Sequence, residues 1–178
     1  MSGTEGAVAG REQSLIFTSR EFRDAMGAFA TGVNVITTRS DDALYGMTAT
    51  AFSSVSLDPP LILVCIGETA EGAEMIGRNG AFAVNVLSAA QEPLSNFFAS
   101  KSRPRGRDAF RSVAHHGGIT GAPLLDGAVA HLDCLVEETH HAGDHLIFIG
   151  AVLALDLDPQ SAPLLFHAGK YALLKPAG

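Results

Sequence analysis

The chain has 178 residues, enough for one domain with its own core and without disulfides or metals to hold it together. A hydrophobic fraction of 47% and a charged fraction of 17% lie near globular averages, which excludes a largely disordered chain. The net charge of -7 argues against nonspecific nucleic-acid binding, and no apolar run approaches the roughly 20 residues that span a bilayer.

The two ends of the chain predict loose segments around a single domain. Residues 1–14 are rich in small residues without periodicity, so we expect a mobile tail there and one domain over residues 15–175. The start lacks the basic residues of a secretory signal. Cys65 and Cys134 lie in separate apolar runs, as buried reduced thiols do. A cytoplasmic location is the simplest expectation.

The first regular element is a short amphipathic helix between Phe17 and Phe29. Thr18 is a cap residue, Glu21 follows it by three positions, and Phe22 and Met26 continue the helical apolar spacing. The break at residues 30–32 leads into a β-branched strand over residues 33–38.

Residues 46–60 follow a strand-like alternation that two prolines end. One parity holds Thr48, Thr50, Phe52, Ser54 and Ser56, and the other holds Ala49, Ala51, Ser53, Val55 and Leu57. Because successive side chains of a strand point to opposite faces, the second, mostly apolar set is expected to face a core. The first set is then free to meet a ligand, and small hydroxyl side chains let a flat ring approach the backbone. A Ser/Thr-rich edge strand without a ligand is the alternative.

The remaining elements predict a mainly antiparallel barrel of about seven strands with two or three short helices. Strands are expected over residues 61–66, 82–87, 127–137 and 145–156, the last two joined by a loose hairpin turn, with short closing strands at 164–166 and 171–174. Helices are expected over residues 73–79, before Gly80, and over residues 89–100, with Leu94, Phe97 and Phe98 on the buried side.

Several common catalytic motifs are missing from this sequence. There is no GxGxxG, GxxxxGK[ST], GxSxG or HExxH, so a Rossmann site, a P-loop, a serine hydrolase and a zinc protease have no support. The histidines show no clear ligand spacing, and we expect no metal site. His145 follows Gly143 and Asp144 where a turn becomes a strand, so it could project an imidazole over a cleft. The alternative is that Asp144 stabilises the turn and His145 faces solvent.

Positive charge is concentrated in one segment of an otherwise acidic chain. Five of the twelve basic residues fall within residues 101–111: Lys101, Arg103, Arg105, Arg107 and Arg111. This cluster indicates either a local anion site or a solvated loop.

Five segments together resemble the short-chain NAD(P)H:flavin oxidoreductases, the FMN-binding split-barrel reductases that supply reduced flavin to two-component monooxygenases. The segments are residues 29–33 (FATGV), 46–60, 82–87 (FAVNVL), 124–127 (LLDG) and 143–150 (GDHLIFIG). They occur in the family's order, and the match spans Phe22 to Leu174.

The resemblance implies an antiparallel Greek-key split barrel with a few flanking helices, a homodimer, and a flavin bound in a groove near the subunit interface. The implied flavin is FMN or FAD. Its predicted contacts are Gly46, Met47, Thr48, Ala49, Thr50, Ala51 and Ser53 along one wall, Cys65, Ile66 and Gly67 at the ring edge, and Phe98, Ala99, Ser100 and Lys101 at the phosphate. Relatives often have Asn-Ser where this chain has Thr50-Ala51, so backbone contacts would replace some side-chain hydrogen bonds.

The same resemblance places the nicotinamide nucleotide, NADH or NADPH, beside the hairpin turn. Gly143, Asp144, His145 and Leu146 inherit that role, with His145 as the catalytic candidate. The implied activity is hydride transfer from the nucleotide to the flavin, and the reduced flavin then serves a separate oxygenase. An FMN carrier without nucleotide turnover and a pyridoxamine-phosphate-oxidase-like enzyme are the alternatives.

Overall fold

The computed structural model describes residues 16–40 and 43–175. The helices are α1 (Ser19–Gly27), α2 (Glu71–Asn79), α3 (Glu92–Ala99) and α4 (Arg107–Phe110), and a 3-10 turn, η1 (Ala89–Gln91), precedes α3. The strands of the main sheet are β2 (Asn34–Ser40), β3 (Ala43–Ala49), β4 (Phe52–Leu57), β5 (Pro60–Gly67), β6 (Ala81–Val86), β9 (Ala130–Ala142) and β10 (His145–Leu157). The short strands are β1 (Thr31–Gly32), β7 (His115–Gly117), β8 (Pro123–Leu125), β11 (Leu165–His167) and β12 (Lys170–Ala172).

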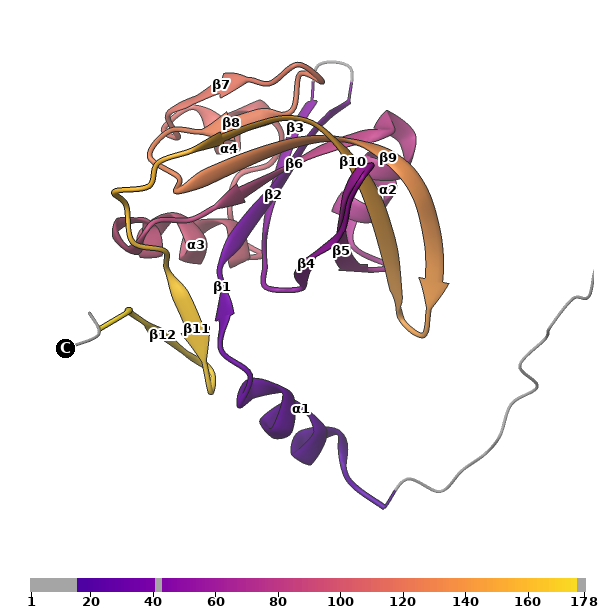
Figure 1. Cartoon of the computed structure of the whole chain (residues 1–178), viewed down its shortest axis with the longest axis vertical. Helices are drawn as coiled ribbons and strands as arrows, with labels where there is room; N and C mark the ends of the chain where they lie inside the picture. The colour runs from indigo at the N-terminus through magenta and orange to yellow at the C-terminus, as the bar shows by residue number, and fades with distance from the viewer. Residues whose placement is uncertain (1–15, 41–42, 176–178) are drawn as a thin grey trace, which may run out of the picture.

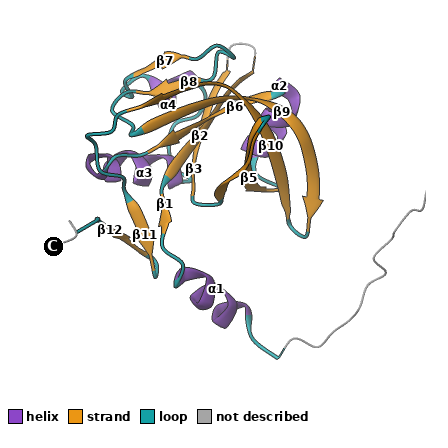
Figure 2. Cartoon of the chain, in the orientation of Figure 1, coloured by secondary structure: helices purple, strands orange, loops and turns teal. Residues whose placement is uncertain are grey.

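One curled antiparallel sheet forms the body of the molecule (Figures 1 and 2). Its seven strands follow the order β3-β2-β6-β9-β10-β5-β4. The edge strands β3 and β4 are consecutive in sequence and are separated only by Thr50 and Ala51. A link of two residues keeps the end of β3 within about 10 Å of the start of β4, so the sheet must bend round into a barrel. The barrel stays open between these two edge strands, and we call this opening, with its link Thr50–Ala51, the seam. The predicted mainly antiparallel split barrel is therefore confirmed.

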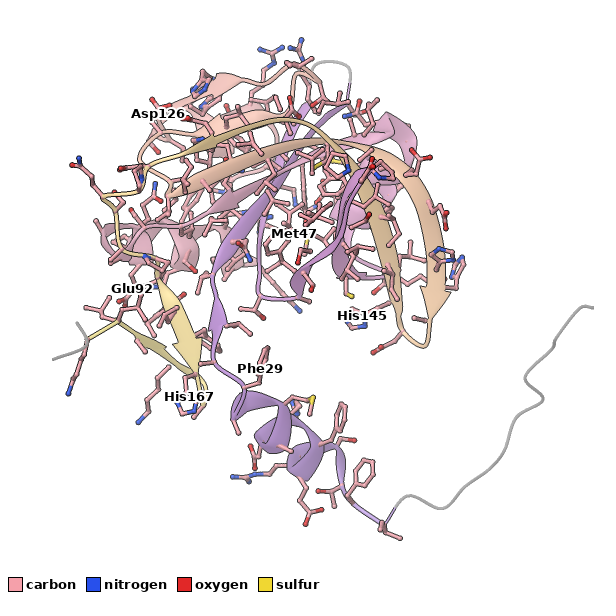
Figure 3. The ribbon with its side chains drawn as sticks, in the orientation of Figure 1. Phe29, Met47, Glu92, Asp126, His145 and His167 are labelled. Carbon is pink, nitrogen blue, oxygen red and sulfur yellow. The ribbon has the colours of Figure 1, made fainter. Side chains whose placement is uncertain are left out.

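The barrel interior is the larger of two cores. It contains Val64, Ile66, Phe82 and Phe148, each at most 1% exposed, and α2 covers one side through Ile76. Burying a large apolar side chain of this kind stabilises the fold by about 1.5–3 kcal/mol. Figure 3 shows Met47 of β3 inside the curve of the sheet, where it packs against this core.

The second core lies outside the barrel, where α3 and α4 cover β3. Phe98 and Phe110 have ring centroids 5.3 Å apart and are almost completely buried. Val35 and Leu125 pack in the same cluster. This core fixes the end of α3, and with it the start of the basic segment.

Asn85 of β6 ties this side of the sheet together. Its side-chain amide donates to the Val35 carbonyl at 3.0 Å and to the Thr37 hydroxyl at 3.1 Å, and its carbonyl oxygen accepts from the Leu125 N–H at 2.7 Å. A completely buried amide needs such partners, because an unpaired polar group would destabilise the core.

Helix α1 lies apart from the barrel (Figure 1). The predicted capping box is present: the Glu21 N–H donates to the Thr18 hydroxyl, and the Glu21 carboxylate accepts from the Thr18 N–H. None of the helix residues is buried, however. Its apolar face is exposed in the single chain, with Phe22 at 52% and Met26 at 57%.

The prediction of one continuous strand over residues 46–57 is wrong. The chain leaves one sheet edge after β3 and joins the opposite edge as β4, so the alternation restarts at the seam. Phe52, expected on the ligand side, packs against the barrel core, whereas Val55 and Leu57, expected in a core, are 49% and 95% exposed. A register shift between Ser54 and Ser56 alters the alternation again within β4.

Other differences concern the short elements. The predicted closing strands, observed as β11 and β12, form a separate three-stranded sheet in which β11 pairs with β1 and with β12, and they do not close the barrel. The run at residues 61–66 alternates between buried and half-buried side chains, because only one face of β5 meets the barrel interior. The predicted tail over residues 1–14 lies outside the described residues. Within the described ranges, no helix is long and apolar enough to cross a membrane.

Candidate active site

The sheet register brings three separate sequence segments to one end of the barrel. The Cys65 N–H donates to the Ala51 carbonyl at 3.0 Å, which joins the seam to the end of β5. On its other side, β5 pairs with β10, and His145 lies opposite Gly67. The predicted flavin ring contacts and the predicted nucleotide turn therefore lie on neighbouring strands.

The turn between β9 and β10 is a tight hairpin. Gly143 has a φ of 64°, a left-handed conformation that favours glycine, and the Glu68 N–H donates to the Asp144 carbonyl at 3.0 Å. The His145 Nδ1 and an Asp144 carboxylate oxygen are 2.7 Å apart, and this hydrogen bond, together with the imidazole charge, lowers the pKa of Asp144 below its ordinary 3.8. The His145 side chain is 48% exposed, at the lower rim of the barrel in Figure 3. It both steadies the turn and remains accessible to a ligand.

The opposite end of the predicted flavin wall is covered by α3. The Thr48 hydroxyl donates to the Ser95 carbonyl at 2.6 Å, so it holds the helix against β3. At Gly46, an added Cβ would lie 2.5 Å from the Phe98 ring. Only glycine permits this close packing.

A pocket of about 260 Å³ opens where β3, the start of α2 and the basic segment meet. Its polar lining includes Tyr45, Glu71, Lys101, Arg103 and Arg105, and we call it the cationic pocket. Three cations and one carboxylate give it a formal charge of +2, in a chain whose net charge is -7. The pocket is suited to an anion.

Arg103 holds the walls of the cationic pocket together. Its guanidinium donates to the Ser100 carbonyl at 2.8 Å and to the Gly46 carbonyl at 2.7 Å. It also lies over the Tyr45 ring, 5.5 Å from the centroid. Arg103 therefore helps to fix the segment after α3 to β3.

The predicted flavin contacts differ in their accessibility. Those that are exposed are Thr50, Ala51, Ser53, Ala99 and Lys101, and those that are half-buried are Met47, Thr48, Ala49, Cys65, Gly67 and Ser100. Gly46 is buried, and the side chains of Ile66 and Phe98 belong to the two cores, so these two residues can meet a ligand only through their backbone. Burial raises the pKa of the Cys65 thiol, which keeps it protonated.

Sequence reasoning missed Tyr45 and Glu71 as part of this site. Tyr45 directly precedes the recognised segment that begins at Gly46, and this adjacency was a usable signal. Glu71 gave no signal, because only the packing of α2 beside β3 brings it to the basic segment. Among the described residues, no group of three or more His, Cys, Asp or Glu side chains is placed to hold a metal ion.

A split barrel with an accessible seam, a neighbouring hairpin turn and a cationic pocket is the arrangement expected of the flavin-binding split-barrel class. The family model described as "Flavin reductase like domain" matches residues 26–175. The NADH-dependent FMN reductase AsuE2 of Streptomyces nodosus subsp. asukaensis is 42% identical over 173 residues, which cover 96% of this chain and 94% of that protein.

Two further comparisons agree. The reductase subunit HsaB of a flavin-dependent monooxygenase from Rhodococcus jostii is 37% identical over 97% of this chain and 84% of its own length. The structure of the Streptomyces globisporus NADH:FAD oxidoreductase SgcE6 in complex with NAD and FAD fragments has a TM-score of 0.83 and 39% identity, over 88% of this chain and 93% of that one. The chain belongs to the flavin reductase-like family.

Proposed function

We propose that this chain is an NADH-dependent flavin reductase that reduces FMN or FAD and releases the reduced flavin to a separate monooxygenase. The proposal depends on the register between β10 and β5, which places the turn at Gly143–His145 beside Gly67. The hydrogen bond from Cys65 to Ala51 places the seam next to the same end of β5. Relatives named as NADH-dependent flavin reductases and as a monooxygenase reductase subunit support the same activity.

The residues at the site fit a flavin at both ends. The cationic pocket suits the phosphate, because charge-assisted hydrogen bonds from lysine and arginine favour a dianion. Thr50 and Ala51 lie between two strands, so we assign their backbone N–H groups to the polar edge of the ring. Their small side chains leave the backbone accessible to a planar ligand.

A bound flavin would supply the redox chemistry, which is hydride transfer from the nicotinamide. The protein needs to hold the two rings in contact, which raises the rate by orientation alone and requires no acid–base triad. We assign this positioning to the turn: Gly143 sets its conformation, Asp144 orients the imidazole of His145, and His145 with Leu146 meets the nucleotide.

We propose a homodimer and a cytoplasmic location as well. The exposed apolar side chains of α1 and of β10 favour a second copy as partner, since a monomer would leave Phe22, Met26, Leu153 and Leu155 in water. A dependence on NADH, together with two free cysteines, fits the cytoplasm. The single domain that we predict over residues 15–175 contains the whole family match.

Anaerobic stopped-flow mixing of the protein and FMN with NADH tests the activity. We expect rapid loss of the oxidised flavin absorbance, and no loss with either NADH or NADPH would discard the proposal in favour of an FMN carrier. His145→Ala should raise the KM for the nucleotide more than the Kd for flavin. His140→Ala is the matched control, because His140 lies on the same hairpin and its ring nitrogen is hydrogen-bonded to Glu138, away from the turn residues.

The flavin phosphate is tested with riboflavin, which lacks that group. Lys101→Ala should weaken FMN more than riboflavin, because only FMN has a phosphate to lose contact with. Equal losses for the two ligands would move the phosphate away from Lys101.

A further inference from the structure

The cationic pocket contains one carboxylate, which the binding of a phosphate does not require. Glu71 begins α2 and faces the basic segment, where its Oε2 lies 3.3 Å from the Arg105 Nη1. The side chain of Glu71 is 43% exposed, so it is only partly screened by solvent.

The three cations of the pocket are not equally available to an anion. Arg103 donates to two backbone carbonyls, so its position is fixed by the protein. Arg105 is paired with Glu71. Within the described residues, Lys101 has no ion pair.

We infer that Glu71 weakens the binding of the flavin phosphate and so keeps the flavin exchangeable, an inference that rests on the proposed function. A phosphate of FMN carries a charge of about -1.5 to -2 at neutral pH. On entering the pocket, the phosphate either competes with Glu71 for Arg105 or leaves that ion pair intact. In the second case Arg105 attracts the phosphate less, because Glu71 already neutralises its charge. In both cases the carboxylate makes the bound state less favourable than it would be with a neutral side chain.

This property suits a reductase that must release its product. Affinity differences between related complexes lie mostly in the dissociation rate. A pocket with three cations and no carboxylate would hold the phosphate longer. Glu71 therefore favours a flavin that binds and leaves as a substrate over one that stays bound as a prosthetic group.

The test replaces Glu71 by glutamine and measures the affinity of the full chain for oxidised FMN and for riboflavin by flavin fluorescence. We expect Glu71→Gln to tighten FMN by about threefold to tenfold at low ionic strength, with a slower release rate and unchanged riboflavin affinity. Glu71→Ala removes the same charge and should give the same selective gain.

Glu74→Gln is the matched control. Glu74 lies on the same helix and is exposed, but it pairs with Arg78 and does not line the cationic pocket. Its FMN affinity should remain that of the wild type. An equal gain in Glu74→Gln, or an equal gain for riboflavin, would overturn the inference.

The failure of this inference is distinguishable from failure of the phosphate assignment on which it rests, and the stopped-flow assay tests the reductase activity separately. If the wild type prefers FMN to riboflavin and Glu71→Gln leaves that preference unchanged, the role of Glu71 is refuted and the phosphate site stands. If the wild type binds both ligands equally, the assignment of the phosphate to the cationic pocket is itself wrong, and the inference falls with it.

Discussion

Replacing Arg103 by methionine should lower the free energy of unfolding by about 2–3 kcal/mol. Arg103 makes two hydrogen bonds to carbonyls, at 2.7 and 2.8 Å, and stacks over Tyr45. A hydrogen bond to a charged group contributes about 1.5–3 kcal/mol when well buried, and roughly 1 kcal/mol is appropriate for each of these part-buried bonds. The cation–π contact adds about 0.5–1 kcal/mol.

Urea unfolding followed by far-ultraviolet circular dichroism measures this change, since the chain has no tryptophan to report on unfolding by fluorescence. Arg105→Met is the control, because Arg105 is 79% exposed and makes one surface ion pair. Its loss should be about 0.5 kcal/mol or less. Arg103→Lys should fall between the two, since an ammonium lacks the fixed fork that reaches both carbonyls. A loss in Arg103→Met no larger than in Arg105→Met would refute the reasoning.

Three further outcomes follow from the packing and the titrating groups. Gly46→Ala should lower stability by about 1–3 kcal/mol in the same urea assay, because its Cβ would overlap a core phenylalanine ring; wild-type stability would contradict the packing. The pKa of the Asp144 carboxyl, followed by NMR, should lie below its ordinary 3.8. The stabilising interaction with His145 is therefore fully present above the ordinary pKa and is lost as the pH falls through the lowered pKa. His145→Ala should bring the pKa of Asp144 back toward 3.8. An alkylating reagent should modify Cys65 before Cys134, and bound flavin should protect Cys65. Cys134 should react slowly because burial and the neighbouring Asp133 carboxylate raise the pKa of its thiol to about 12. Equal reactivity of the two thiols would refute this difference.

Sequence motifs correctly predicted the helix ends and the hairpin, whose conformations are determined by residues close together in the chain. The spacing of Thr18 and Glu21 gave the start of α1, and Gly80, with a φ of 66°, ends α2 as expected of a left-handed cap. The hairpin of β9 and β10 likewise follows from Gly143. In each case the residues that decide the conformation are neighbours in the chain.

The errors arose where strands distant in sequence come together. The alternation of residues 46–57 does not indicate that the chain changes from one sheet edge to the other. That change depends on the positions of β2, which pairs with β3, and of β5, which pairs with β4. The exposed Leu57 and the core-facing Phe52 could not be foreseen for that reason. Arg103 was recognised as part of a basic cluster, but its two carbonyl partners come from separate elements of the fold.

The seam also links ligand occupancy to the integrity of the sheet. Thr50 and Ala51 connect β3 to β4, and within the described sheet β4 pairs with β5 and with no other strand. A flavin resting on this connection would fasten both margins of the sheet at once, and a ligand at a hundred times its Kd adds about 2.7 kcal/mol to the folded state. Each release of reduced flavin would then leave the two edge strands joined only by the protein itself, so the stability of the barrel would change with every turnover.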